Sequence, residues 1–563
     1  MKRTLIEHRM DSPDAFPLSE NSFFVRLRVS KGERFDKVEV LYNDKYDFPK
    51  KQYHLKMIRK GGDATWDNYE AILPLQDRRL AYIFRLVRGG KKSFFSEEGL
   101  KDNYDFPQSY FSFFQYAFIN DTDIVKIPSW AKKACFYEIF VDRFNRGDGS
   151  KDDSYVNMRW GGKVKTDSFA GGDIKGISDK LDYLTGLGIN ALYLTPIFLS
   201  KSNHKYDTID YFRIDPEFGN SDDLKTLVSL AHGKGMHVVL DAVFNHCSSD
   251  CKEFQDVVKN GDKSPYYDWF IIHGTKVNMR KPNYEMFASC SYMPKINTSN
   301  PEAAAKLIEV GTHYIKDFGI DGWRLDVSDE VAHSFWRAFR LAVKNANPDC
   351  LLIGENWHDS YSYLEGDQFD SIMNYTLTKA CLDYFAGERP SAATMAERCN
   401  HLLMRNKAPV NFMMLNLLDS HDTTRFLTSL HGNRSRFYAA LAFLYFYQGM
   451  PCLYYGDEIP LEGGYDPDNR RCFPSRIPED SFLGRIKGLT ALRRMPLFQE
   501  GDISVEEENG MLKVKRSLGR NEMSLFINLT DGRKRPKTGE RLLENGWKDG
   551  FLEPNGFVIA KGE

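Results

Sequence analysis

Four short segments of this chain end in ionisable residues, and they carry most of its chemistry. Each begins as an apolar run and ends in polar side chains, the pattern of a buried parallel strand whose C-terminal end opens into an active site. In chain order the segments are 241–246, 322–326, 354–357 and 419–422. Three of them deliver a carboxylate that has no covering Lys or Arg directly beside it in the sequence: Asp326, Glu355 and Asp422. Two or three carboxylates that converge on one site are the working parts of a retaining glycoside hydrolase.

The elements that would position these carboxylates alternate from about residue 130 onward. We expect eight strands, at 135–140, 189–196, 237–246, 319–327, 350–357, 371–375, 410–422 and 451–459. Helical patterns lie between most of them, for example over 301–318 and 330–345, where the second has one apolar stripe. Eight apolar strands alternating with helices predict an α/β fold, a (β/α)8 TIM barrel, with a doubly wound open sheet as the alternative. The polar residues at nearly every strand end favour closure around one central site.

Other parts of the chain have a different pattern. The two ends alternate apolar and polar residues, which predicts antiparallel β-domains. The connection after the third barrel strand is too long for a simple loop, which predicts a small inserted domain. We therefore expect an N-terminal β-sandwich (1–125), the barrel (126–246 and 300–497), the inserted domain (247–299) and a C-terminal antiparallel β-sandwich (498–563).

Composition and charge exclude several classes of partner. A chain of 563 residues exceeds what one core usually supports, so several domains are expected. With 76 Lys+Arg against 78 Asp+Glu, nothing suggests nucleic acid or an anionic membrane as a partner. We expect neither a signal peptide nor a membrane span. The nine cysteines are odd in number and scattered, and Cys247 and Cys251 lack neighbours at zinc-ligand spacing. A reduced, cytoplasmic protein is therefore expected.

The four segments resemble, in order, spacing and residue identity, the four signature regions of the α-amylase superfamily, glycoside hydrolase family thirteen. The resemblance covers roughly 130–500. The run Met-Pro-Lys-Ile-Asn at 293–297 is similar to a fifth region of the neopullulanase, cyclomaltodextrinase and maltogenic amylase subfamily. Segments 203–208 and 464–470 also look like that subfamily. So does an N-terminal β-domain of this length, which is similar to a family thirty-four carbohydrate-binding module.

The resemblance implies a role for each matching residue. Asp326 would be the nucleophile that attacks the anomeric carbon, and Glu355 the general acid and then the base for water. Asp422 would hold the sugar 2- and 3-hydroxyls. Arg324, two positions before Asp326 and on the same face of its strand, would hold that carboxylate ionised and oriented. The other sugar-binding residues implied by the family are His246, His421, Tyr206, His204, Asp207, Phe287, Trp357, Asp466 and Arg470.

Three features modify this picture. Asp241 is interpreted as mainly structural, orienting Arg324. Asn356 stands where relatives usually carry an apolar residue; it either bonds an acceptor sugar or changes local packing.

Relatives often bind calcium in the loop after the first strand, and here Arg146 and Lys151 stand where oxygen ligands are expected. The acidic residues that remain there are Asp148, Asp152 and Asp173. A cationic side chain cannot donate a lone pair to Ca²⁺, so we predict no metal and no cofactor.

The function implied by the resemblance is retaining hydrolysis of α-1,4-glucosidic bonds, with α-1,6 bonds as a further target. Maltodextrins, cyclodextrins and pullulan would be cut to maltose and short oligosaccharides, with some transglycosylation. The alternatives are another amylase-type α-glucosidase, an α-1,6-acting enzyme, or a non-catalytic carbohydrate-binding protein. The presence of all three carboxylates argues against the last. The subfamily also implies a homodimer formed through the N-terminal domain.

Overall fold

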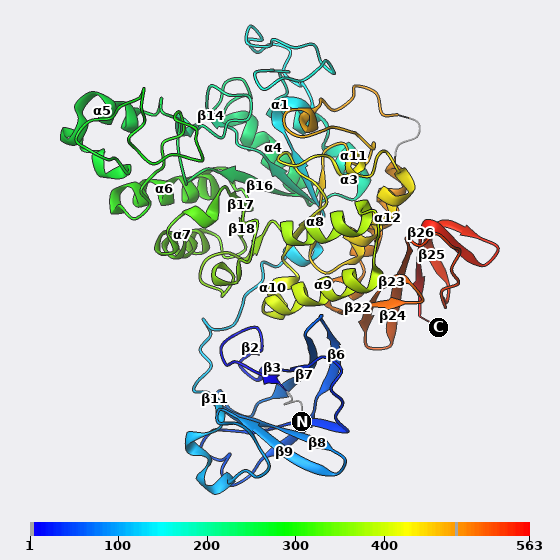
Figure 1. The fold of residues 1–563 in the computed structure, drawn as a ribbon. Helices are drawn as coiled ribbons and strands as arrows, with labels where there is room; N and C mark the ends of the chain where they lie inside the picture. Colours follow the sequence, from blue (N-terminus) through cyan, green and yellow to red (C-terminus); the bar gives the residue numbers. More distant parts are fainter. Residues whose placement is uncertain (1–4, 479–481, 563) are drawn as a thin grey trace. The chain divides into compact units, whose positions relative to one another are not determined.

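The computed structural model describes residues 5–478 and 482–562, which divide into two compact units (Figure 1). One unit contains Pro128–Glu388 and Met413–Glu500. The other contains Met1–Ile127, Arg389–Phe412 and Gly501–Glu563. Each unit is described by itself below.

The first unit is built around eight parallel strands. They are β12 (Phe136–Ile139), β13 (Ala191–Leu194), β16 (His237–Ala242), β17 (Gly322–Leu325), β18 (Leu351–Gly354), β19 (Ser371–Ile372), β20 (Leu415–Leu417) and β21 (Met450–Tyr454). β21 pairs with β12, and a parallel bridge between Met373 and Leu415 joins the last two neighbours, so the sheet closes. Spatial order follows chain order around the ring, and the predicted (β/α)8 barrel is confirmed.

The strands are buried and short. Every residue of β12, β13, β17, β18, β20 and β21 is buried. In a strand covered on both faces, every side chain is buried, so apolar and polar residues do not alternate. This explains the continuous apolar runs of the sequence. The strands end earlier than the predicted ranges. Asp326 and Glu355 each follow the last residue of a strand, so they lie at the start of the loops at the carboxyl ends.

Helices cover the outside of the barrel (Figure 1). α6 (Pro301–His313) begins after Asn300, whose side chain accepts the backbone N–H groups of the first turn. α7 (His333–Ala346) buries the predicted apolar stripe. α12 (Arg434–Phe446) is buried from Phe437 onward. The connection between β18 and β19 contains a single 3-10 turn, Tyr361–Tyr363, where the ideal fold has a helix. The other helices of this unit are α1 (Val141–Phe144), α2 (Ile174–Asp179), α3 (Leu181–Leu187), α4 (Ser221–Gly233), α5 (Lys252–Asn260), α8 (Tyr375–Cys381), α11 (Phe426–Ser429), α13 (Leu483–Arg493) and α14 (Pro496–Glu500).

The long connection after β16 forms the predicted insertion. It contains α5 and two 3-10 turns, Gly261–Lys263 and Tyr267–Trp269, and is otherwise irregular. Phe254 of α5 packs edge-on against Phe270 and Tyr284, which gives the insertion a small core of its own. A bridge between His246 and Lys295 ties its end back to the barrel. A short hairpin, β14 (Phe198–Leu199) and β15 (Asp210–Ile214), lies in the preceding connection.

The second unit contains the predicted N-terminal sandwich. One antiparallel sheet consists of β1 (Ile6–Glu7), β2 (Ala15–Ser19), β3 (Ser22–Ser30), β6 (Ile58–Gly62) and β7 (Trp66–Pro74). The other consists of β4 (Lys37–Asn43), β5 (Tyr53–Lys56), β8 (Leu80–Arg88), β9 (Lys91–Ser96), β10 (Gly99–Lys101) and β11 (Phe114–Tyr116). Inward side chains of both sheets, such as Leu27 and Phe84, share one apolar core.

The C-terminal strands are antiparallel, as expected, and the described residues place them in one sheet. The order is β22 (Asp502–Glu508), β23 (Met511–Leu518), β24 (Asn521–Asn528), β26 (Phe551–Lys561) and β25 (Arg541–Lys548). Helix α9 (Ala392–Arg405) contacts β22 and β23, so a helix covers this sheet where a sandwich would have a second sheet. α10 (Ala408–Asn411) follows α9.

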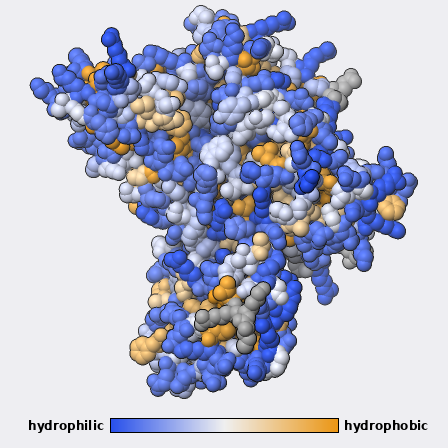
Figure 2. All heavy atoms as spheres, in the orientation of Figure 1, coloured by the Kyte–Doolittle hydropathy of each residue, from blue (hydrophilic) through white to orange (hydrophobic). Residues whose placement is uncertain are grey.

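The surface agrees with the balanced charge. On the face drawn in Figure 2, hydrophilic residues predominate and hydrophobic ones are scattered. Throughout residues 5–478 and 482–562, no helix is both long and apolar enough to cross a bilayer.

Candidate active site

A cavity of about 460 Å³ lies among the loops that follow the barrel strands. Most of the predicted site residues line it: His204, Tyr206, His246, Phe287, Asp326, Glu355, Trp357, Asp422, Asp466 and Arg470. Arg324 and His421 lie behind the carboxylates and are fully buried. Asp207 is also buried, and its carboxylate accepts hydrogen bonds from the hydroxyls of Ser200 and Ser202. The structure therefore brings the predicted set to one place, with three members beneath the cavity wall.

Arg324 is the charge around which the carboxylates are arranged. Its Nη1 donates to Asp326 Oδ1 at 2.7 Å and to the two oxygens of Asp241 at 3.1 and 3.0 Å. Its Nη2 lies 3.0 Å from Glu355 Oε1. Burial disfavours the charged guanidinium, but Asp241 and Glu355 outweigh burial and raise the pKa of Arg324 well above its usual value. Asp241 thus holds Arg324 from below, which agrees with its predicted structural role.

The two candidate catalytic carboxyl groups have different surroundings. Glu355 Oε1 accepts the indole N–H of Trp357 at 3.1 Å, and Oε2 accepts the backbone N–H of Val327 at 2.9 Å. Burial is the largest effect on Asp326, and the neighbouring charge of Glu355 is the next. Together they raise the pKa of Asp326 well above its usual value, against the opposing effect of Arg324. Both carboxyl groups contact the Arg324 guanidinium, and like charges buried around one cation resist joint ionisation. One ionised and one protonated carboxyl group are what a retaining glycosidase needs.

Val327 links the two carboxyl groups through a strained turn. Its φ of 44° and ψ of 45° lie in the left-handed region, which β-branched residues rarely adopt. This conformation directs the Val327 N–H at Glu355 immediately after Asp326. Strained backbone of this kind persists where the surrounding structure fixes it, commonly at functional sites.

Asp422 belongs to a second charged group. His421 Nδ1 donates to Glu138 Oε1 at 2.6 Å, and its Nε2 lies 3.0 Å from Asp422 Oδ2 and 2.6 Å from the Tyr206 hydroxyl. Burial lowers the pKa of His421, but Asp422 and Glu138 outweigh burial and raise it to about 10. The imidazolium and Arg470 in turn overcome burial and hold the pKa of Asp422 well below its usual value. Asp422 is therefore ionised and fixed.

Glu138 was not predicted from the sequence. It lies on β12, is fully buried, and accepts both the backbone N–H of His421 at 3.0 Å and its imidazole. The only signal in the sequence is a carboxylate inside an apolar strand, since an unpaired buried charge is costly and needs a partner. The sequence could not say which partner, because His421 is 283 positions away. Other cavity residues that were not predicted as site residues are Cys290, Tyr292, Met293, Val327, Asp329 and Tyr465, of which Met293 and Tyr465 lie in segments that resemble the subfamily.

Aromatic rings form much of the cavity wall. Phe287 stacks on His246 with centroids 4.8 Å apart, and Trp357 stacks on Tyr375 at 3.8 Å. Burial lowers the pKa of His246 to about 3, so this ring is neutral at pH 7. Trp357 is 42% exposed, which leaves one broad apolar surface open to a ligand. Flat apolar walls combined with a few fixed polar groups suit a sugar ring.

The structure places Asp466, Arg470 and Asn356 as follows. Arg470 Nη1 lies 3.1 Å from Asp466 Oδ1, and its Nη2 donates to Asp422 Oδ1 at 3.4 Å, so both predicted loop residues join the carboxylate site. Asn356 is buried, and its side-chain oxygen accepts a hydrogen bond from Ser328. This contact favours the packing interpretation of Asn356.

The loop after β12 places a lysine among oxygen atoms. Lys151 Nζ donates to the carbonyl oxygens of Gly171 at 2.8 Å and Glu217 at 2.9 Å, and it lies 2.9 Å from Asp173 Oδ2. The Lys151 side chain is only 7% exposed. Arg146, in contrast, is partly exposed and pairs with Asp153. The oxygens at this position therefore surround an ammonium group.

The barrel and its carboxylates define a class of enzyme. Buried carboxyl groups that share one guanidinium, at the carboxyl ends of barrel strands and beside aromatic walls, are suited to glycosidic bond cleavage. Residues 138–481 match the catalytic domain of alpha amylase, and residues 1–120 match the alpha amylase N-terminal ig-like domain. The chain belongs to the α-amylase family and is a glycoside hydrolase.

Individual relatives span nearly the whole chain. A cyclomaltodextrinase from Thermoanaerobacter pseudethanolicus is 45% identical over 500 residues, which cover 88% of this chain and 86% of the relative. An intracellular maltogenic amylase from Bacillus subtilis is 39% identical over 543 residues, covering 94% and 91%. A solved structure of a cyclomaltodextrinase superposes with a TM-score of 0.89 at 35% identity, covering 99% of this chain and 97% of that one.

The contact between Glu138 and His421 predicts the behaviour of Glu138→Gln. A hydrogen bond to a charged group contributes about 1.5–3 kcal/mol, so we expect kcat to fall about 10- to 100-fold. The pKa of His421 in the folded enzyme, about 10, lies above its ordinary 6.5. Its contribution to stability is therefore complete below pH 6.5 and is lost as pH rises through about 10. The difference in Tm between wild type and variant should be largest near pH 6 and shrink toward pH 10.

The matched control is Glu458→Gln. Glu458 is also a fully buried barrel carboxylate, and it accepts the hydroxyls of Tyr137 and Tyr183. The Glu458→Gln variant should have a lower Tm, but its kcat should not fall as it does in Glu138→Gln. Equal kcat losses in both variants would contradict a specific role for Glu138.

Proposed function

We propose that this enzyme hydrolyses α-1,4-glucosidic bonds of maltodextrins, cyclodextrins and pullulan with net retention, and transfers some glycosyl groups to sugar acceptors. The observation that carries the proposal is the pair Asp326 and Glu355, which share one guanidinium beside an aromatic cavity. The cyclomaltodextrinase and maltogenic amylase relatives support this substrate class. α-1,6 bonds are a further target.

In this proposal each group has a role. Asp326 attacks the anomeric carbon while Glu355 gives its proton to the glycosidic oxygen, and a covalent glycosyl-enzyme forms. Glu355 then removes a proton from water, which attacks the same carbon and releases Asp326. Arg324 holds the nucleophile throughout. A sugar hydroxyl that replaces this water gives transglycosylation. Asp422, kept ionised by His421, accepts hydrogen bonds from the sugar 2- and 3-hydroxyls.

Digestion of β-cyclodextrin, pullulan and soluble starch, by wild type and Glu355→Gln, tests this proposal. We expect cyclodextrin or pullulan to be cleaved faster than starch. General acid–base catalysis contributes about 10²- to 10⁴-fold, so the variant should lose at least about 100-fold. Proton NMR of the first product should show the α-anomer before mutarotation.

The outcomes separate the alternatives. A β-anomer as the first product would overturn retention. Activity confined to starch would overturn the substrate class but leave the mechanism. Pullulan products identified by chromatography separate α-1,4 from α-1,6 cleavage, and no hydrolysis of any substrate would support a binding protein.

We further propose that the enzyme needs no metal, because Lys151 supplies the positive charge at its oxygen cluster. EDTA should leave wild-type activity and Tm unchanged. Lys151→Gly removes the ammonium, which takes its hydrogen bond from the Gly171 carbonyl and its ion pair from the buried Asp173 carboxylate, so Tm should fall. Millimolar Ca²⁺ should restore part of that loss in Lys151→Gly, since oxygen atoms are the ligands calcium takes.

The control for Lys151→Gly is Arg146→Ala, which removes an exposed cation from the same loop and should change stability by less than about 0.5 kcal/mol. A drop in wild-type Tm or activity on adding EDTA would overturn the metal-free proposal.

We also propose a homodimer formed through residues 1–125 and action inside the cell. The subfamily resemblance supports the dimer, and the relative called intracellular maltogenic amylase supports the location. Sedimentation equilibrium should give twice the chain mass of 65.0 kDa for the full chain and a monomer once 1–125 are removed. A monomeric full chain at micromolar concentration would contradict the dimer.

A further inference from the structure

Two cysteines meet at the base of the insertion, directly beside the active site. The Sγ atoms of Cys247 and Cys251 lie 3.1 Å apart, and both residues are thiols. Bonded sulfurs are about 2.05 Å apart, so a shift of about 1 Å would join them. A backbone hydrogen bond from Cys251 N–H to the Ser248 carbonyl at 3.0 Å closes the intervening turn. The turn thus already holds the thiols near bonding distance.

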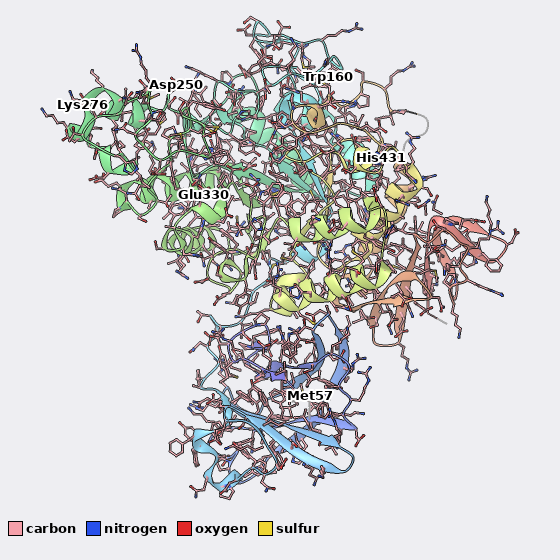
Figure 3. The ribbon with its side chains drawn as sticks, in the orientation of Figure 1. Met57, Trp160, Asp250, Lys276, Glu330 and His431 are labelled. Atoms are coloured by element: carbon pink, nitrogen blue, oxygen red, sulfur yellow. The ribbon has the colours of Figure 1, made fainter. Side chains whose placement is uncertain are left out.

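A second cavity lies against these two buried thiols. Its volume is about 180 Å³, and Cys247 and Cys251 both contribute to its lining together with Tyr211, Trp269 and Phe270. It is separate from the cavity that contains the carboxylates, and its lining is largely apolar. Asp250, labelled in Figure 3, precedes Cys251 and forms an ion pair with Lys201 at 2.7 Å. An uncharged oxidant the size of hydrogen peroxide fits this space.

The turn is connected to the substrate site through the backbone. Cys247 directly follows His246, which lines the catalytic cavity and stacks on Phe287. The Cys247 N–H donates to the Pro294 carbonyl at 3.2 Å, and the Ser249 N–H donates to the Tyr292 carbonyl at 2.8 Å. A change at the thiols therefore acts on the segment that carries His246 and on Tyr292, which also lines the catalytic cavity.

We propose that Cys247 and Cys251 form a reversible disulfide when the enzyme meets a peroxide, and that this bond weakens substrate binding or turnover by displacing His246. One thiol loses its proton, and the thiolate attacks the peroxide; a sulfenic acid forms, and the released hydroxide takes up the proton to give water. The second thiol then displaces the sulfenic hydroxyl as a further water molecule, and the S–S bond forms. Two thiols are oxidised and one peroxide is reduced to two waters. A dithiol reductant reverses the bond by thiol–disulfide exchange.

Peroxide treatment of the full-length enzyme tests both parts of the proposal. Peptide mass spectrometry without reduction should find 247 and 251 linked, and dithiothreitol should remove the link. The kcat/KM for β-cyclodextrin, relative to each protein's untreated value, should fall at least about twofold in wild type and recover on reduction. Cys251→Ser should lose both effects, and Cys247→Ser is the second variant if Cys251→Ser fails to fold.

Cys290→Ser is the matched control, because Cys290 is the more exposed thiol and lines the catalytic cavity. It should keep the response to peroxide. Absence of the 247–251 link would overturn the oxidation site. Formation of the link with unchanged kcat/KM would overturn its coupling to His246. The activity readout rests on the proposed substrate; the mass readout does not, so failure of the substrate class is distinguishable from failure of the site.

Discussion

The active site depends on one buried guanidinium. Arg324 is surrounded by Asp241, Asp326 and Glu355, and none of these carboxylates could stay charged at this depth without it. The guanidinium suits the task because its fork can bond several oxygens at once and it does not lose its proton. Removing it would leave buried negative charge without compensation, which is why the nucleophile and the acid cannot be positioned independently.

The other half of the site repeats this arrangement with a different cation. His421 is an imidazolium between Glu138 and Asp422. The Tyr206 hydroxyl donates to Asp241 and so joins the charges around His421 to those around Arg324. The charges therefore form one continuous buried network. Hydrogen-bonded networks of this kind hold their members in place, which keeps the reacting groups fixed. The strained backbone of Val327 is the local cost of this placement.

Two further features lie beside the barrel strands. Lys151 places an ammonium among three oxygens, and in our proposal this group stands in place of a bound cation. The insertion after β16 is attached through the turn that contains Cys247 and Cys251, so the same few residues connect the barrel, the substrate cavity and a pair of thiols. Because this connection is short, we expect oxidation of the two thiols to change the position of residues in the active site.

The sequence determined what depends on neighbours along the chain. Eight buried strands, their order and the carboxylates at their ends follow from local apolar patterns, because burial on both faces removes alternation. Family resemblance added the roles of Asp326, Glu355 and Asp422. Tertiary structure alone decided which charges meet: Glu138 and His421 are 283 positions apart, and Lys151 meets an oxygen 66 positions away. A charged residue within an apolar strand predicts that it has a partner. Which residue that partner is depends on how the barrel closes.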